Sequence, residues 1–270
     1  MAKGRMAKKW IYIAMAVLLL TGCEIIREDE RLLPVHLATD TTGRAHVLIE
    51  FTGFRCVNCP NAAAAAEALH ETYGERLIVV AMHPASNPFT QGMYDYTCEA
   101  ADYYYTSMGG KATTPFPTGN IDFFGSNGGY LHDCPEWPAL VAARMKEQEY
   151  VHLSVETELD ATTHELTIRT SCYADEPQNC HIVTWLVEDS IQGAQALPDG
   201  SVDYQYYHRH VLRTAIGAPQ GRAMELTQST VTTTTNYTLP EEYNPEHCSV
   251  IAVITNKNND IINARQTKIQ

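Results

Sequence analysis

Two cysteines separated by two residues, Cys56 and Cys59, have the clearest potential for chemistry in this chain. They follow an apolar run, Val47 to Phe54, and precede an alanine-rich stretch that favours a helix. At such a junction the first cysteine meets the unpaired amides and the positive end of the helix dipole, which favour the thiolate. Because the thiolate is the nucleophile in disulfide exchange, the pair predicts this chemistry. We expect Cys56 to be the exposed attacking thiol and Cys59 the shielded resolving thiol.

A Cys-x-x-Cys pair is also half of a zinc site, but the chain has no second pair of cysteines or histidines to complete four ligands. His208 and His210 would share one side of an expected strand, where they either bind a metal or a ligand or pack structurally. No third ligand has a matching spacing, so we expect no metal and no cofactor. His83, at the end of a second apolar run, is a candidate neighbour of the dithiol. Glu50 and Glu67 are expected at the surface or at a strand edge.

The N-terminus has the pattern of an export signal. A basic segment is followed by the apolar run 10–20, which is short for a membrane span and typical of a signal peptide. The next residues, Leu20 to Cys23, resemble a bacterial lipobox, which implies cleavage after residue 22 and a lipid on Cys23. A plain signal peptide or one short anchor helix is the alternative. Residues 1–22 are therefore a predicted lipoprotein signal peptide, and the lipid is the predicted membrane contact.

Charge and cysteine content narrow the possible partners. Removal of residues 1–22 deletes four cationic and no acidic side chains, so the mature charge is (19 − 4) − 32 = −17. Such a chain repels phosphate groups, which argues against a nucleic-acid partner. Eight cysteines in an exported chain indicate an oxidising compartment. With Cys23 lipidated, seven remain, so at least one thiol is free or pairs between molecules.

The first half has the order strand, helix, strand. Residues 23–40 are polar and predict a tether, and residues 41–150 predict an α/β domain. Within that domain the apolar and alanine-rich patterns predict a βαβ unit with parallel strands, then a helical insertion between residues 84 and 111, and then a closing helix. The expected ranges are a strand at 47–54, a helix at 56–73, a strand at 77–82, a helix at 93–108 and a helix at 137–148.

The stretch 47–66 resembles the active-site segment of thioredoxin-fold proteins. The segment 113–118 resembles the cis-proline loop that this fold places opposite the dithiol, and Pro117 is favoured over Pro115 because an expected strand at 121–124 follows it. The resemblance therefore implies that Pro117 belongs to the site. Two departures leave the direction of exchange open: Phe54-Arg55 replaces the usual tryptophan before the first cysteine, and Pro60 replaces a basic residue.

The second half of the chain has a different pattern of apolar and polar residues from the first half. Short alternating runs with polar turns between them are typical of antiparallel sheets that bury one face. Their number and spacing predict an immunoglobulin-like β-sandwich over residues 151–270. The fold class expected for the whole chain is thus α/β plus all-β. The expected strands are 151–158, 165–172, 181–187, 230–239, 249–255 and 261–268.

The remaining cysteines suggest structural crosslinks. Cys172 and Cys180 flank a polar loop between two expected strands, so a disulfide between them would clamp a hairpin. Cys98 with Cys134 is the second candidate pair. Cys248 lies in an apolar strand and is the expected buried free thiol.

Motifs in both halves resemble one family. The segment 47–62, together with Val187 to Asp189, Gln192 and Tyr207 to Arg213, is similar to thioredoxin-like lipoproteins related to a twenty-eight-kilodalton outer-membrane protein. This resemblance implies a lipid-anchored bacterial outer-membrane protein with a thioredoxin fold and a C-terminal β-domain. Two functions follow as hypotheses. One is thiol–disulfide exchange with protein thiols or disulfides, and the other is a non-catalytic surface binding or adhesion role.

Overall fold

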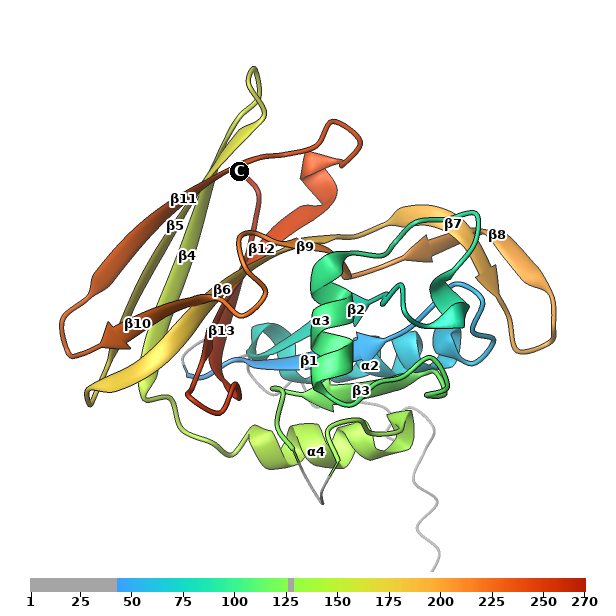
Figure 1. The fold of residues 1–270 in the computed structure, drawn as a ribbon, viewed down its shortest axis with the longest axis horizontal. Helices are drawn as coiled ribbons and strands as arrows, with labels where there is room; N and C mark the ends of the chain where they lie inside the picture. The colour runs from blue at the N-terminus through green and yellow to red at the C-terminus, as the bar shows by residue number, and fades with distance from the viewer. Residues whose placement is uncertain (1–42, 126–128) are drawn as a thin grey trace, which may run out of the picture. The chain divides into compact units, whose positions relative to one another are not determined.

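The computed structural model describes residues 43–125 and 129–270. The predicted signal peptide, Cys23 and the predicted tether lie outside these residues. The first described elements are β1 (His46–Phe51), α2 (Cys59–Tyr73) and β2 (Leu77–Met82), as Figure 1 shows. Pro60 sits in the first turn of α2, where its missing N–H is not needed, and Gly74, with φ 57°, ends the helix.

The central strands are buried on both faces. β1 pairs with β2 in parallel and with β3 (Thr118–Ile121) antiparallel. Because side chains alternate along β1, Val47, Ile49 and Phe51 point to one face of the sheet and Leu48 points to the other. β3 begins and ends earlier than the predicted strand at 121–124, because Asp122 and Phe123 adopt positive φ values and terminate it.

Helices cover both faces of these strands. α3 (Glu99–Ser107) packs on the face of Val47, while α2 and α4 (Trp137–Arg144) pack on the face of Leu48. α3 starts six residues later than predicted, so Tyr94 precedes it. None of the helices in the described ranges is long and apolar enough to cross a membrane. The described part of the chain also contains four short 3₁₀ helices, at Gly74–Arg76, Pro88–Thr90, Cys134–Glu136 and Pro245–His247.

The second half consists of strands, and all six predicted strands are present. Sequence analysis missed four further strands, β7 to β10, which are short or interrupted by glycine and polar residues. The observed strands are β4 (Val151–Asp160), β5 (Glu165–Ala174), β6 (Gln178–Glu188), β7 (Ile191–Ala196), β8 (Val202–His208), β9 (Val211–Ala215), β10 (Arg222–Leu226), β11 (Val231–Thr238), β12 (Cys248–Thr255) and β13 (Ile261–Lys268).

One sheet runs through both halves of the chain. Its order is β13-β12-β6-β9-β2-β1-β3, and β10 also pairs with β6. β9 joins the halves, because it pairs antiparallel with β6 and in parallel with β2 through Ala81 and Val211. The regions predicted as separate domains, 41–150 and 151–270, therefore share a sheet. The fold is mixed α/β, mostly strands in several sheets with few helices.

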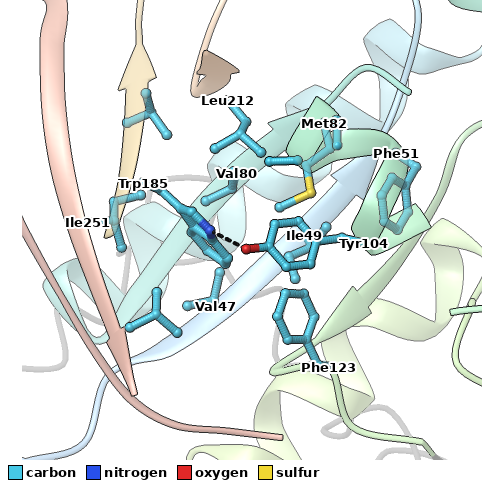
Figure 2. Packing of buried hydrophobic residues seen from close by; sticks show 14 of the residues in the cluster. Val47, Ile49, Phe51, Val80, Met82, Tyr104, Phe123, Trp185, Leu212 and Ile251 are labelled. Atoms are coloured by element: carbon cyan, nitrogen blue, oxygen red, sulfur yellow. Dashed lines mark hydrogen bonds between the residues drawn. The ribbon is translucent and has the colours of Figure 1, made fainter. Parts of the chain in front are cut away.

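A second, three-stranded sheet, β11-β5-β4, packs on part of the first sheet. Buried residues of β4 and β5, such as Leu153 and Ile168, meet residues of β6 and β12, such as Leu186 and Ile254. The opposite face of β6 points to α3, as Figure 2 shows: the indole Nε1 of Trp185 donates a hydrogen bond of 2.9 Å to the hydroxyl of Tyr104. The first sheet thus has apolar cores on both faces.

Candidate functional site

Cys56 and Cys59 form a disulfide between the end of β1 and the start of α2, with a Cα–Cα distance of 5.4 Å. The backbone N–H of Cys56 donates to the carbonyl of Gly53, and that of Cys59 donates to the carbonyl of Cys56. Cys59 is the first residue of α2, so its sulfur lies at the end of the helix where amides are unpaired. This is the strand-to-helix junction that the spacing predicted.

Both cysteines are buried, each with 2% of its surface exposed. The prediction of an exposed Cys56 is therefore wrong, because β7 lies over it. The side-chain amide of Gln195 donates a hydrogen bond of 2.9 Å to the carbonyl of Cys56, and the N–H of Ala196 donates to the carbonyl of Phe54. β7 also packs closely against Tyr96: a Cβ at Gly193 would lie 1.8 Å from the hydroxyl oxygen of Tyr96, so only glycine fits at this position.

Glu50 is buried on β1, contrary to the expected surface or edge position. Alternation places its side chain on the face that α2 covers, the same face as Leu48. Its Oε1 has no hydrogen-bond partner among the described residues. Burial disfavours the carboxylate and raises the pKa of Glu50 to about 8, although a hydrogen bond with Thr52 partly opposes this. Glu50 is therefore protonated near neutral pH.

A cavity of about 390 Å³ lies beside the disulfide and has both Cys59 and Glu50 in its wall. It opens to the surface and is lined by residues of β1, β2, α2, the β7–β8 hairpin and the segments that follow β2 and β8. His83 also lines it, as the sequence position after β2 suggested. The imidazole of His83 has no partner on either nitrogen among the described residues, and burial lowers its pKa to about 3. The full wall consists of Glu50, Thr52, Cys59, Pro60, Ala63, Ala64, Ala66, Glu67, Val79, Ala81, His83, Gln195, Tyr206, Tyr207, His208, Arg209 and His210.

His208 and His210 do not share one side of a strand, because β8 ends at His208 and His210 has a positive φ of 54°. The buried Nε2 of His208 hydrogen-bonds to the carbonyl of Ala194, and burial lowers its pKa to about 4. His210 instead lies between the carboxylates of Glu67 and Asp189, at 3.2 and 3.3 Å. Structural packing, the second of the two alternatives, therefore accounts for both rings.

Glu67 is half-buried at the edge of the cavity and is not isolated. Its carboxylate contacts His210 and, at 3.3 Å, the guanidinium of Arg209. Burial of the carboxyl is outweighed by the hydrogen bond and charge of His210 and by the charge of Arg209, so the pKa of Glu67 is lowered. Within residues 43–125 and 129–270, no three His, Cys, Asp or Glu side chains are grouped as metal ligands.

The peptide bond between Phe116 and Pro117 is cis. It directly precedes β3, whose Thr118 pairs with Phe51 at the end of β1. Phe116 belongs to the same buried cluster as Cys56 and Cys59. The loop is thus held close to the end of β1, from which the chain leads into the disulfide, and a role for Pro117 in exchange stays a prediction.

The other five cysteines within residues 43–125 and 129–270 are free, so neither of the predicted structural disulfides forms. Cys172 lies on β5 and Cys180 on β6; these strands belong to different sheets and do not form a hairpin. Cys98 is the N-cap residue of α3, whereas Cys134 packs with α4 on the opposite face of the sheet. Cys248 is a buried free thiol, and burial raises its pKa to about 12.

Three residues of the site were not found from the sequence in their actual roles: Glu50, Gln195 and Tyr206. The signal for Glu50 was a carboxylate in the middle of a strand buried on both faces, six residues before Cys56. Gln195 and Tyr206 belong to β7 and β8, which carried no clear strand pattern. Only their contacts over the disulfide and the cavity identify them.

A family model identifies the family of the chain, and solved structures are similar to it in fold. The family model of outer membrane protein Omp28 matches residues 105–270, which excludes Cys56 and Cys59. No curated protein matches the chain. Among solved structures, HBP35 of Porphyromonas gingivalis is similar with a TM-score of 0.65 and 17% identity, covering 84% of this chain and 76% of that one.

Two further structures are similar at lower scores. Protein AGR_C_4864 from Agrobacterium tumefaciens has a TM-score of 0.50 and 15% identity, covering 83% of this chain and 96% of that one. A domain of the outer membrane lipoprotein Omp28 from Porphyromonas gingivalis has a TM-score of 0.33 and 14% identity, covering 45% of this chain and 89% of that domain. The likeness to HBP35 and to AGR_C_4864, at 17% and 15% identity, concerns the fold and not the chemistry of the site.

Proposed function

This chain belongs to the Omp28 family of outer membrane proteins, and we propose that its Cys56–Cys59 pair carries out thiol–disulfide exchange at that membrane. The single observation that carries the proposal is a disulfide that closes at the first turn of α2, directly after a central strand. The strand, helix, strand unit with Pro117 in a cis bond supports a thioredoxin-like fold for the first half. The packed sheets support an immunoglobulin-like sandwich as the second half.

The proposed reaction uses the two sulfurs in sequence. In the reduced protein, the Cys56 thiolate attacks a partner disulfide, forms a mixed disulfide and releases one partner thiolate. The Cys59 thiolate then attacks the Cys56 sulfur, which closes the internal disulfide and releases the second partner thiol. The reverse sequence oxidises a partner dithiol.

Glu50 has a role in this scheme. Cys59 must lose its proton before it can attack, and Glu50 lies in the wall of the same cavity. Because burial raises the pKa of Glu50 to about 8, this carboxyl is mostly protonated near neutral pH, and the carboxylate form, which accepts a proton, becomes the main form only above about pH 8. We therefore assign Glu50 the proton transfer at Cys59.

The five free cysteines do not compete with the pair. Burial is the main reason why the pKa of each of these five thiols is raised, and the pKa is about 11 for Cys98 and for Cys180. A thiol with such a pKa holds little thiolate near neutral pH and reacts slowly. Exchange is thereby confined to Cys56 and Cys59.

Trapping with single substitutions tests the proposal. Cys59→Ser leaves the attacking thiol without its resolving partner, so we expect stable mixed disulfides with disulfide-containing partner proteins. Cys56→Ser should abolish exchange, and Cys98→Ser, a substitution at a half-buried free cysteine, is the matched control that should retain it. Exchange that survives Cys56→Ser, or equal trapping by all three variants, would contradict the proposal.

A non-catalytic surface binding or adhesion role is the second candidate, and the burial of both sulfurs under β7 favours it. In that case the disulfide is structural, and its reduction potential lies below about −300 mV, as is usual for structural disulfides. The exchange role requires a potential in the range of catalytic pairs, about −120 to −270 mV. Equilibration with glutathione and dithiothreitol buffers separates the two cases.

A further inference from the structure

The β7–β8 hairpin lies over the disulfide but is not part of the main sheet. β7 and β8 pair with each other as a separate two-stranded sheet (Figure 1). Among the described residues, one backbone hydrogen bond links these two strands to the body of the protein, from the N–H of Ala196 to the carbonyl of Phe54. The buried side chain of Gln195 adds its hydrogen bond to the carbonyl of Cys56. The hairpin can therefore open without disturbing the hydrogen bonds of the main sheet.

Both ends of the hairpin have the geometry of a hinge. Ser190 directly precedes β7 and has a φ of 58°, and His210 follows β8 with a φ of 54°. Residues other than glycine rarely adopt such values, so the chain changes direction at these two positions. The backbone is anchored right beside them: the N–H of Asp189 donates to the carbonyl of His247, and the N–H of Ala81 donates to the carbonyl of His210. The boundary between the anchored sheet and the hairpin therefore lies at Ser190 and His210.

A carboxylate holds the two ends of the hairpin together. Oδ1 of Asp189 accepts a hydrogen bond of 2.7 Å from the backbone N–H of His210 and lies 3.3 Å from the ring Nδ1 of the same residue. Because these contacts join the chain before β7 to the chain after β8, the two strands are expected to move as one unit.

Closure of the hairpin leaves polar groups beneath it without partners. The ring of His208 on β8 lies 4.5 Å from the ring of Tyr96 and 6.1 Å from the ring of His83, measured between centroids. The hydroxyl of Tyr96 and both ring nitrogens of His83 are buried and have no hydrogen-bond partner among the described residues. An unsatisfied buried polar group is destabilising, and water reaches such a group when the element above it moves away. These groups therefore favour an open hairpin, whereas the hydrogen bonds of Gln195 and Ala196 favour the closed one.

We propose that the β7–β8 hairpin is a hinged cover, which opens about Ser190 and His210 and so controls the access of partners to Cys56 and Cys59. The control of exchange rests on the function proposed above, whereas the opening itself does not. In the closed state each cysteine is 2% exposed, so a reductant reaches the disulfide only when the cover is open. Gln195 is a positioning residue in this scheme, because its amide holds the cover against the loop that carries Cys56.

The first measurement is the rate at which the phosphine reductant TCEP, a probe that needs no protein partner, reduces the disulfide of the full chain. Acid stops the reaction at intervals, and mass spectrometry then measures the reduced fraction of the tryptic peptide 56–76, which contains no other cysteine. Gln195→Ala removes the amide contact and should raise the rate about tenfold, as the loss of one buried hydrogen bond predicts. Gln205→Ala, at an exposed position of β8, is the matched control and should react like the parent.

Two further measurements separate opening of the cover from unfolding of the whole chain. In the oxidised parent, the N–H of Ala196 should exchange its hydrogen at least about tenfold faster than the amides of the central strand β1, because only the former is freed when the cover opens. The rate of TCEP reduction should also change little in urea below the unfolding transition, since opening of one hairpin exposes little surface.

Equal reduction rates for the parent and Gln195→Ala, or a reduction rate with the same steep urea dependence as unfolding, would overturn the proposal. Oxidation of a peptide dithiol at the same rate by the parent and by Gln195→Ala would also overturn it and would leave the exchange function standing. Faster TCEP reduction of Gln195→Ala, in a protein that oxidises no peptide dithiol, would support the cover and show instead that the exchange function has failed.

Discussion

Glu50→Gln should remove a pH dependence of stability that the buried carboxyl creates. Burial raises the pKa of Glu50 from an ordinary value of 4.5 to about 8 in the folded protein. Below pH 4.5 the carboxyl is protonated in both the folded and the unfolded state, so its contribution to stability is fully present. As the pH rises from 4.5 through 8, the unfolded state gives up its proton first and the folded state is penalised.

The magnitude follows from the two pKa values. They differ by about 3.5, and each unit corresponds to about 1.4 kcal/mol, so the total loss is about 5 kcal/mol, of which about 4 kcal/mol falls between pH 5 and pH 9. Glu50 is only 2% exposed, so screening by solvent does not reduce this figure much. The neutral amide that Glu50→Gln introduces does not titrate, so the variant should show no such loss.

The assay is urea unfolding of the oxidised parent and of Glu50→Gln at five pH values from 5 to 9. The quantity of interest is the difference between the two free energies of unfolding, because titration of His83 and other shared groups largely cancels. Glu67→Gln is the matched control: the pKa of Glu67 is lowered, so this variant should not relieve the loss at high pH. A difference between parent and Glu50→Gln that stays constant within about 1 kcal/mol from pH 5 to pH 9 would refute the reasoning.

Three further outcomes are expected. Limited alkylation of the oxidised protein near neutral pH should label the half-buried Cys134 before the buried Cys172, Cys180 and Cys248, with Cys248 among the slowest; peptide mapping by mass spectrometry measures the order, and uniform labelling would contradict it. Tyr104→Phe should lower the free energy of unfolding by about 1–3 kcal/mol, because it leaves the buried indole N–H of Trp185 without its acceptor; urea unfolding at pH 7 measures this, and an unchanged midpoint would contradict it. The mature N-terminus should be a lipidated Cys23, and a natively expressed protein whose N-terminal peptide retains Met1 or an unmodified Cys23 would show otherwise.

Local sequence patterns were sufficient to locate the elements around the disulfide. The apolar run at 77–82 matches β2 at both ends, and Pro60 and Gly74 mark the two ends of α2. The alternating runs of the second half likewise gave β4, β5, β6, β11, β12 and β13 to within a few residues. These signals are local, since helix propensity and strand alternation depend on neighbours only a few positions apart.

The arrangement of strands depended on contacts that no local pattern encodes. β9 is short and lies between β6 and β2, so residues 41–150 and 151–270 share one sheet where the sequence suggested two domains. The cysteine pairings failed for a related reason: Cys172 and Cys180 are near in sequence, but the chain between them crosses from one sheet to the other. A strand chooses its partner by burial and hydrogen bonding across long sequence separations.

The candidate site also combines local features, which the sequence showed, with tertiary contacts, which it did not show. The sequence identified Cys56 and Cys59 because their spacing and their place before a helix are local features. It missed the burial of Glu50, because a lone carboxylate is rarely buried and only the packing of α2 over β1 encloses this one. It also missed the cover over Cys56, since β7 reaches the disulfide from about 140 residues further along the chain. The sequence therefore identified the two cysteines that can do chemistry. Tertiary contacts decided how exposed the side chains of the site are and whether Glu50 is protonated, because the desolvation of a side chain depends on every element that packs around it.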